Sequence, residues 1–571
     1  MATNKSQPQL KKRLKSLLLY SLVLFLPVFY AYYNLWNTFF VADAWHMLNS
    51  YIQLKDYGFS YFFQLFAMPY GIHFLPIGVG LSTLQSYLFG MNVTGFGLLS
   101  LSLHFLNVLL VFFSVRRNTK NIVLALLAGL FFGVNYQIHE GVFWFASNLW
   151  TELSTSFVLI GLYFLIEYYR EKRIKHFIIS YLLFTASIFL REYSFMLFPL
   201  SIIFYLWLLL HDRSHVKRYI AFIGIYTFNI IAYLILRIFF VYAVNPVILT
   251  SQNISLQHLP YLIGWYVFTL PFKILANILI PEHAILFLTN FISKRIYFEL
   301  PIAQTDVFLS VLFFDQLYIF FGFVIVTLIG FLVTLIIRRK NVDKTPVYLY
   351  GLGFVIIPYI FLTLSTYIYW TFSRYLYLPA AVFSVFFFSL LSYFRILQRK
   401  NVVSLVLLSV FLLYLALNGQ MGHDYFVKFV KLGQQRKEIL ATLSEKLDFS
   451  KRDQIVYVKP VGEVYKNDID VFDIGTSFGK VLLIWSWYHG NSKQIPPCLY
   501  DPMFLFNSNN QYKSCEGKGY GYFQDIDRLT QIVKSQTIDP QNLDAFDYDI
   551  KTGEIRDISS EIREIIYGPK K

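Results

Sequence analysis

Residues Lys11–Trp36, KKRLKSLLLYSLVLFLPVFYAYYNLW, decide the fold class because a basic cluster leads directly into an apolar run. A helix of about 20 apolar residues crosses a hydrocarbon core roughly 30 Å thick. Lysine and arginine favour the cytoplasmic side, so the stretch predicts a span at Leu17–Trp36 with the N-terminus in the cytoplasm. No convincing small-residue cleavage site follows, which favours a retained signal anchor.

The composition of the whole chain indicates that lipid is part of its solvent. Of 571 residues, 56% are hydrophobic and 15% are charged, and the mean hydropathy is +0.51. Backbone amides in lipid must be paired within a helix or a closed barrel, and the alternation typical of barrel strands is absent. The formal charge of +15 arises from basic residues in short loops, so it sets membrane orientation and does not indicate a nucleic-acid partner.

The same pattern recurs and predicts an all-α polytopic membrane protein with about eleven spans. After the first, the expected spans are Phe96–Val115, Ile122–Val134, Leu149–Tyr168, Phe177–Leu190, Ser194–Leu210, Tyr219–Val241, Val311–Ile337, Val347–Leu364, Leu376–Tyr393 and Val402–Leu417. The stretch Leu259–Ile280 is broken by Pro271 and Lys273, and a span there would turn the later basic loops outward. We therefore expect it to be interfacial or re-entrant on the outer face.

An odd number of spans places the two ends of the chain on opposite sides of the membrane. We expect a membrane domain at residues 1–418, with outer loops at 38–95 and 243–310. Residues 419–571 have a different composition and predict a small extracytoplasmic α/β domain of common size. The expected location is the plasma (inner) membrane, with several crossings.

The tail carries local signals of both helix and strand. A helical pattern runs through Phe426–Leu447, and strand-like runs lie at Gln454–Val458 and Lys480–Trp487. Cys498 and Cys515 are the two cysteines of the chain. They are expected to form a disulfide in an oxidising compartment or to remain two free thiols.

Two acidic residues near the outer ends of spans are candidates for chemistry, because acids at membrane depth are costly. Asp43 follows the first span, although on local sequence it also fits a solvated cap of a helix beginning near Trp45. Glu140 lies between the third and fourth spans, where a satisfied interfacial pair with His139 is the alternative. Adjacent residues point in different directions on a helix, so these two are poor co-ligands for one metal ion.

Three arginines are expected near the same outer rim. Arg191, followed by Glu192, ends the fifth span; Arg374 opens the tenth; and Arg237 lies within two turns of the outer end of the seventh. The planar guanidinium group donates two parallel hydrogen bonds to phosphate and stays charged. Snorkelling of each side chain at a helix end is the alternative explanation.

Short motifs follow one another between residues 17 and about 400. They are Asp43, His73–Pro76 (HFLP), Asn135–Val142 (NYQIHEGV), Arg191–Glu192 and Ser373–Pro379 (SRYLYLP). Taken in this order, they resemble the GT-C superfamily of polyprenyl-phosphate-sugar-dependent glycosyltransferases, especially the protein O-mannosyltransferase relatives, and imply a GT-C-like fold for the membrane domain. Two departures are the alanines that flank Asp43, where many relatives have consecutive acidic residues, and Asn135-Tyr136 in place of the family's His-Pro.

The resemblance implies an inverting enzyme that moves a sugar from a polyprenyl-phosphate donor to a protein, lipid or glycan acceptor. Asp43 would act as base or orient the acceptor, and Glu140 would orient the acceptor or bind a cation. A divalent ion, Mg²⁺ or Mn²⁺, would need Asp43 and Glu140 together. The donor phosphate would be held chiefly by Arg374, with Arg191 and Arg237 assisting. Supporting roles fall to His46, His73, His139 and Glu192.

Two rival functions belong to other classes. A transporter or flippase of lipid-linked intermediates predicts inverted repeats and broken helices near mid-membrane, and neither is evident in the sequence. A non-catalytic scaffold would not need the acidic loop and the arginines on one side. In both cases the discriminating observation is whether Asp43, Glu140 and Arg374 line one outward-facing cavity.

Overall fold

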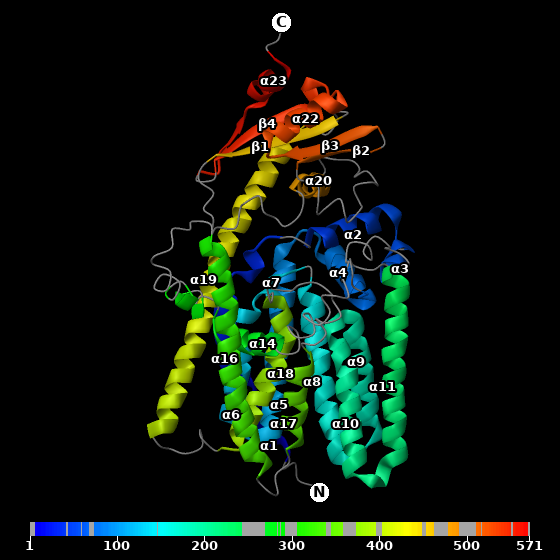
Figure 1. Ribbon diagram of the computed structural model, residues 1–571, viewed down its shortest axis with the longest axis vertical. Coiled ribbons are helices and arrows are strands. Elements are labelled where there is room, and N and C mark those ends of the chain that lie inside the picture. Colours follow the sequence, from blue (N-terminus) through cyan, green and yellow to red (C-terminus); the bar gives the residue numbers. More distant parts are fainter. Residues whose placement is uncertain are drawn as a thin grey trace.

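The fold is a bundle of long helices with a small sheet above one end (Figure 1). The computed structural model describes residues 6–40, 44–58, 60–67, 74–145, 147–242, 269–281, 284–285, 287–289, 291, 305–338, 344–357, 373–394, 402–447, 453–461, 478–489, 510–515, 517–549 and 552–568. Asp43, His73 and Cys498 lie outside the described residues, and the side chains of His46 and Cys515 are not described.

Within these ranges, eight helical segments are long and apolar enough to cross a membrane. These segments lie on α1 (Ser6–Ala31), α5 (Val93–Thr119), α8 (Asn148–Glu171), η3 (Glu192–Met196) with α10 (Leu197–His211), η4 (Arg213–His215) with α11 (Val216–Arg237) and η5 (Ile238–Tyr242), α16 (Thr305–Ile337), α18 (Ser373–Ser392) and α19 (Val402–Lys446). A ninth is added if α6 (Ile122–Gly133) is counted with η2 (Tyr136–Ile138) and α7 (Glu140–Phe143), across a bend of 51°.

The predicted fold class, a mostly helical polytopic membrane protein, is confirmed, but the predicted number of eleven spans is not. Two expected spans, Phe177–Leu190 and Val347–Leu364, fall on the shorter apolar helices α9 (Ile174–Leu190) and α17 (Thr345–Ile356). Part of the second lies beyond the described residues. The stretch expected to be interfacial or re-entrant includes a third short apolar helix, α14 (Leu270–Leu279), which packs against α16.

Large apolar side chains cover the outside of the bundle as well as its centre. Phe228, Leu328 and Leu405 are each more than half exposed, whereas Val108 and Leu162 on the central helices are fully buried. Exposed apolar surface on this scale is unfavourable in water and favourable against hydrocarbon. The distribution therefore marks the outer surface of the bundle as its lipid-facing surface.

The end of the bundle nearest the sheet is covered by short helices (Figure 1). They are η1 (Leu35–Asn37), α2 (Ala44–Tyr57), α3 (Ser60–Ala67) and α4 (Pro76–Phe89). Proline at the first position of α4 suits a helix start, and Gly90, with φ of +56°, ends it. Helix α4 lies in the segment 38–95, which was expected to be a loop, and it packs on α2, α8 and α9.

The opposite end carries ion pairs between basic loops and acids. Glu167 near the end of α8 accepts hydrogen bonds from Arg117 at 3.2 and 3.0 Å and from Arg170 at 2.9 Å. Lys172 lies 3.0 Å from Asp212 in the next loop. These pairs tie α5, α8 and α10 together at the basic end.

The tail is a five-stranded sheet in the order β2 (Gln511–Cys515), β3 (Lys518–Phe523), β1 (Asp453–Val461), β4 (Leu543–Asp549), β5 (Ile555–Asp557). The three central strands are parallel and the two edge strands pair antiparallel. Ile455 and Tyr457 face a core with α22 (Ile526–Gln536) and α23 (Ser559–Tyr567), whereas Val456 and Val458 join the main core with α20 (Phe478–Tyr488). A short η11 (Pro540–Asn542) precedes β4. Both faces of the sheet are therefore covered.

Two expectations about the tail change. The strand predicted at Lys480–Trp487 is wrong, because this segment forms helix α20; a short apolar run does not distinguish a strand from a buried helix. The expected domain boundary at 418/419 lies inside α19, which continues without a break for 45 residues. The predicted strand Gln454–Val458 is confirmed as part of β1.

Candidate functional site

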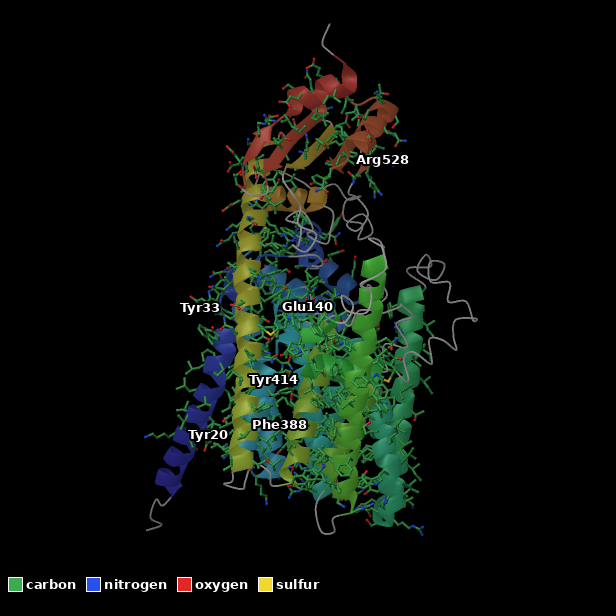
Figure 2. All side chains as sticks on the ribbon, turned by 60° about the vertical axis from the view of Figure 1, so that its left-hand side comes forward. Tyr20, Tyr33, Glu140, Phe388, Tyr414 and Arg528 are labelled. Atoms are coloured by element: carbon green, nitrogen blue, oxygen red, sulfur yellow. The ribbon has the colours of Figure 1, made fainter. Side chains whose placement is uncertain are left out.

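Glu140 and Arg374 meet at the end of the bundle nearest the sheet. Glu140 is the first residue of α7, and Arg374 is in the first turn of α18. The backbone N–H of Arg374 donates to Glu140 Oε2 at 3.2 Å. A carboxylate at this position interacts favourably with the unpaired N–H groups and the positive end of the helix dipole. Figure 2 shows Glu140 above Tyr414 and Phe388, toward the sheet.

The side chain of Arg374 lies among aromatic rings. Its Cζ atom is 4.6 Å from the ring centroid of Trp144 and 5.4 Å from that of Tyr375. Cation–π contacts of this kind orient a guanidinium group without neutralising its charge. These aromatic contacts therefore hold the guanidinium group of Arg374 between Trp144 and Tyr375.

Arg191 lies on the other side of the same tyrosine. Its Cζ atom is 5.3 Å from the ring centroids of both Tyr193 and Tyr375, and the residue is only 8% exposed. Arg191 forms no ion pair with any residue that the structure describes. A buried cation at membrane depth is costly unless an anion or a polar environment compensates it. The two arginines thus flank Tyr375 and concentrate positive charge at the rim.

Glu192 connects three parts of the chain and is almost fully buried. Its Oε1 atom accepts the backbone N–H of Phe74 at 2.9 Å and the hydroxyl of Tyr233 at 3.3 Å, and it lies 3.2 Å from Arg237 Nε. Arg237 therefore has a counter-ion, whereas Arg191 has none within the described part of the chain. The contact with Phe74 also fixes the chain one residue after His73.

His139 faces a different set of partners from Glu140. Its Nδ1 atom is 2.6 Å from the carbonyl oxygen of Tyr136, which can only accept, so Nδ1 carries the proton. The imidazole ring stacks on Tyr136 and Phe143 and meets Tyr425 of α19 edge-on at 4.4 Å. His139 thus contributes to packing between the η2–α7 segment and α19.

The structure brings together some of the predicted site residues. Glu140, Arg374 and Arg191 converge around Tyr375, and Arg237 pairs with Glu192. Whether Asp43 joins them stays a prediction, since that residue lies outside the described ranges. Among the described residues, no three His, Cys, Asp or Glu side chains are grouped to hold a metal ion.

A buried polar network below this rim was missed by the sequence analysis. Tyr377 OH lies 2.8 Å from His104 Nδ1 and accepts from Asn107 Nδ2 at 3.3 Å, while His104 Nε2 lies 3.0 Å from the carbonyl oxygen of Gly133. Because that carbonyl only accepts, His104 carries its proton on Nε2 and receives the hydroxyl proton of Tyr377 on Nδ1. Asn107 also donates to the Glu152 carbonyl oxygen at 2.9 Å.

Glu152 is the member of this network that the sequence could have revealed. It lies inside the expected span Leu149–Tyr168, and an ionisable residue within a span is a functional candidate by default. Its burial is complete, with 0% of the residue exposed. The sequence analysis instead selected Asp43 and Glu140, which were expected to lie in loops at the ends of apolar runs.

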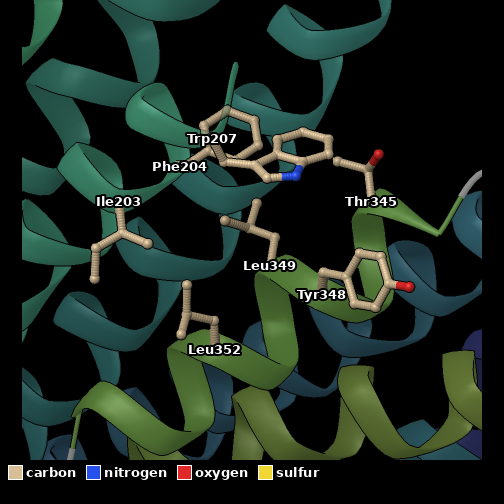
Figure 3. A pocket seen from close by; sticks show the side chains of 7 residues that line it. All are labelled: Ile203, Phe204, Trp207, Thr345, Tyr348, Leu349 and Leu352. Carbon is tan, nitrogen blue, oxygen red and sulfur yellow. The ribbon is translucent and has the colours of Figure 1, made fainter. Parts of the chain in front are cut away.

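An apolar pocket of about 180 Å³ lies between α10 and α17, away from these polar groups (Figure 3). Its walls are almost entirely hydrocarbon and aromatic, and they consist of Ile203, Phe204, Trp207, Thr345, Tyr348, Leu349 and Leu352. Because α10 leads from the rim toward the basic end and α17 begins there, the pocket belongs to the opposite end of the bundle from Glu140.

Comparison with known proteins finds no family model that matches this chain and no curated protein that matches it. The assignment of a function therefore rests on the chemistry of Glu140, Arg191 and Arg374 around Tyr375.

Proposed function

We propose that this protein is a membrane glycosyltransferase that moves a sugar from a polyprenyl-phosphate donor to an acceptor on the extracytoplasmic face. The observation that carries the proposal is Arg191, a buried cation without an ion-pair partner among the described residues, beside Arg374 across the ring of Tyr375. Two guanidinium groups on either side of one ring suit a phosphate that enters from the lipid.

In this proposal the acceptor hydroxyl attacks the anomeric carbon directly. The bond between that carbon and the phosphate oxygen breaks, the electron pair leaves with the polyprenyl phosphate, and the hydroxyl proton passes to Asp43 as base. Arg374 and Arg191 stabilise the charge that develops on the phosphate. Arg237 contributes less, because its charge is shared with Glu192. Inversion at the anomeric carbon follows from a single displacement.

Glu140 has two roles in the proposal. Its contact with the backbone of Arg374 keeps the first turn of α18 in place, and its carboxylate orients the acceptor or binds a divalent cation together with Asp43. The acceptor approaches from the side of the C-terminal sheet, which covers this end of the bundle (Figure 1).

The proposed topology has eleven crossings, with a cytoplasmic N-terminus and an extracytoplasmic sheet. The eight long segments, the bent pair of α6 and α7, and the short helices α9 and α17 together supply that number. The ion pairs of Arg117, Arg170 and Lys172 cluster at the end away from the sheet, as expected for cytoplasmic loops. Single cysteines introduced at Lys172 and Lys534 should react with a membrane-impermeant reagent from opposite sides.

The proposed activity is tested with purified protein and defined polyprenyl-phosphate sugars. We expect donor cleavage by the wild type and an increase of about tenfold or more in the donor KM of Arg191→Ala, from the loss of a charge-assisted contact. Arg191→Lys should recover part of the affinity, and the exposed Arg338→Ala at the basic end serves as control. Movement of intact donor across vesicles without cleavage would favour a flippase instead.

A further inference from the structure

Glu152 lies in the second turn of α8, inside the bundle. Its Oε1 atom is 2.9 Å from the hydroxyl of Ser100 on α5, and Oε2 has no hydrogen-bond partner among the residues that the structure describes. The groups around it are the hydroxyls of Tyr32 and Tyr377 and the polar side chains of α5. No described cation lies within ion-pair distance of Glu152. A carboxylate anion here would be uncompensated, which a membrane interior strongly disfavours.

The hydroxyl of Ser100 has a second contact that fixes where the protons are. Ser100 Oγ lies 2.5 Å from the carbonyl oxygen of Val142 in α7, and a carbonyl oxygen can only accept. Ser100 has one proton, which this shorter contact uses. The contact with Glu152 must then be one in which Ser100 accepts, so the carboxyl group must donate. Only a protonated Glu152 can do so.

The same contacts reach the candidate site through α7. The carbonyl oxygen of Val142 also accepts from Asn148 Nδ2 at 3.2 Å. One residue earlier, Gly141 lies so close to Tyr377 that an added Cβ would be 2.5 Å from that ring. Glu140 precedes this glycine and holds the N-terminus of α18. The position of Glu140 thus depends on the four-residue helix α7, which is held by Ser100, Asn148 and Tyr377.

We propose that Glu152 is a protonated acid at neutral pH and that its hydrogen bond to Ser100 positions α7, and with it Glu140 against Arg374. Glu152 is a positioning residue: it touches neither donor nor acceptor. Its effect on sugar transfer rests on the proposed function, whereas its protonation does not. The orphan Oε2 is then a neutral carbonyl oxygen, which is less costly to bury than a charged one.

The protonation state is tested by infrared difference spectroscopy of the purified protein in lipid at neutral pH. The wild-type minus Glu152→Gln spectrum should contain the carbonyl band of a protonated carboxylic acid, and this band should shift in heavy water. Glu167→Gln is the matched control on the same helix. Glu167 is ionised by its pairing with Arg117 and Arg170, so its substitution should leave the band unchanged. A carboxylate band in place of the acid band would overturn the proposal.

The positioning role is tested by the pattern of variants. Glu152→Gln keeps a neutral donor for Ser100 and should retain donor turnover within about twofold, whereas Ser100→Ala should lower kcat about tenfold with little change in donor KM. Ser384→Ala is the control, because Ser384 is equally buried and bonds only to the backbone of its own helix. Equal loss of turnover in Glu152→Gln and Glu152→Ala would overturn the positioning role.

The two proposals fail in different ways. If the wild type cleaves no polyprenyl-phosphate sugar, the proposed function fails, and the infrared band still decides the state of Glu152. If turnover is measured but the acid band is absent, the proposed function stands and the inference about Glu152 is wrong.

Discussion

At the scale of single residues, the pairing of Glu192 with Arg237 holds the C-terminal end of α11. Glu192→Gln would leave Arg237 without its counter-ion in a site where that residue's side chain is 16% exposed. We expect a loss of about 3 kcal/mol in unfolding free energy, since removing one partner of a buried pair leaves an uncompensated charge. The measurement is chemical unfolding in detergent.

The double variant Glu192→Gln/Arg237→Gln is the control for this effect. It should be less destabilised than Glu192→Gln alone, because it removes both charges. Additive losses would mean that the two residues act independently. A raised donor KM in Arg237→Gln at unchanged stability would instead support a direct phosphate role for Arg237.

Residue-scale contacts were only partly predictable. The sequence marked Glu140, Arg191 and Arg374 because charges at the ends of apolar runs are conspicuous. It could not pair Glu192 with Arg237, since η3 and α11 are joined through α10, and the register of the two helices decides the contact. Glu152 could have been identified from the sequence, because it is an acid inside a predicted span.

At the scale of elements, the loop between α10 and α11 is stabilised by Asp212. Hydrogen bonds from Ser214, Tyr219 and Lys172 hold the pKa of Asp212 well below its ordinary value of 3.8. A folded-state pKa below the unfolded value gives stability that is complete above pH 3.8 and is lost as the pH falls toward the folded-state pKa.

Asp212→Asn should therefore lower the Tm at pH 7, and the difference from wild type should shrink below pH 3.8. Glu171→Gln, which removes a partly exposed ion pair in the same region, is expected to change little at either pH. A Tm difference for Asp212→Asn that does not depend on pH would contradict the assigned cause.

Element type was predictable where a run was long. The expected spans fall on apolar helices because about twenty apolar residues leave few alternatives, and β1 was found from its β-branched run. Segment Lys480–Trp487 was misassigned since eight apolar residues suit a buried strand or a buried helix. The end of the membrane domain could not be predicted either. The composition changes near residue 418, but helix α19 continues through this change without a break.

At the scale of the whole molecule, α19 makes the bundle and the tail interdependent. Beyond residue 418, its Tyr425, Phe426 and Phe429 pack on Phe143, with ring centroids 5.6, 5.9 and 4.7 Å apart. A chain ending at residue 418 loses this aromatic cluster, at a cost of several kcal/mol. A chain ending at Leu447 keeps it and should melt at a distinctly higher temperature in detergent. Equal melting temperatures would show that the cluster contributes little.

The unbroken length of α19 also sets a distance. At 1.5 Å per residue, 45 residues extend about 67 Å, and roughly 30 Å of this suffices for the hydrocarbon core. The remainder acts as a rigid spacer that sets the height of the sheet above the lipid. Inserting one helical turn of four residues would raise the sheet by about 6 Å and rotate it by about 40°. If the proposed function holds, a fixed height of the sheet would select acceptors whose modified group lies at a matching distance from the bilayer.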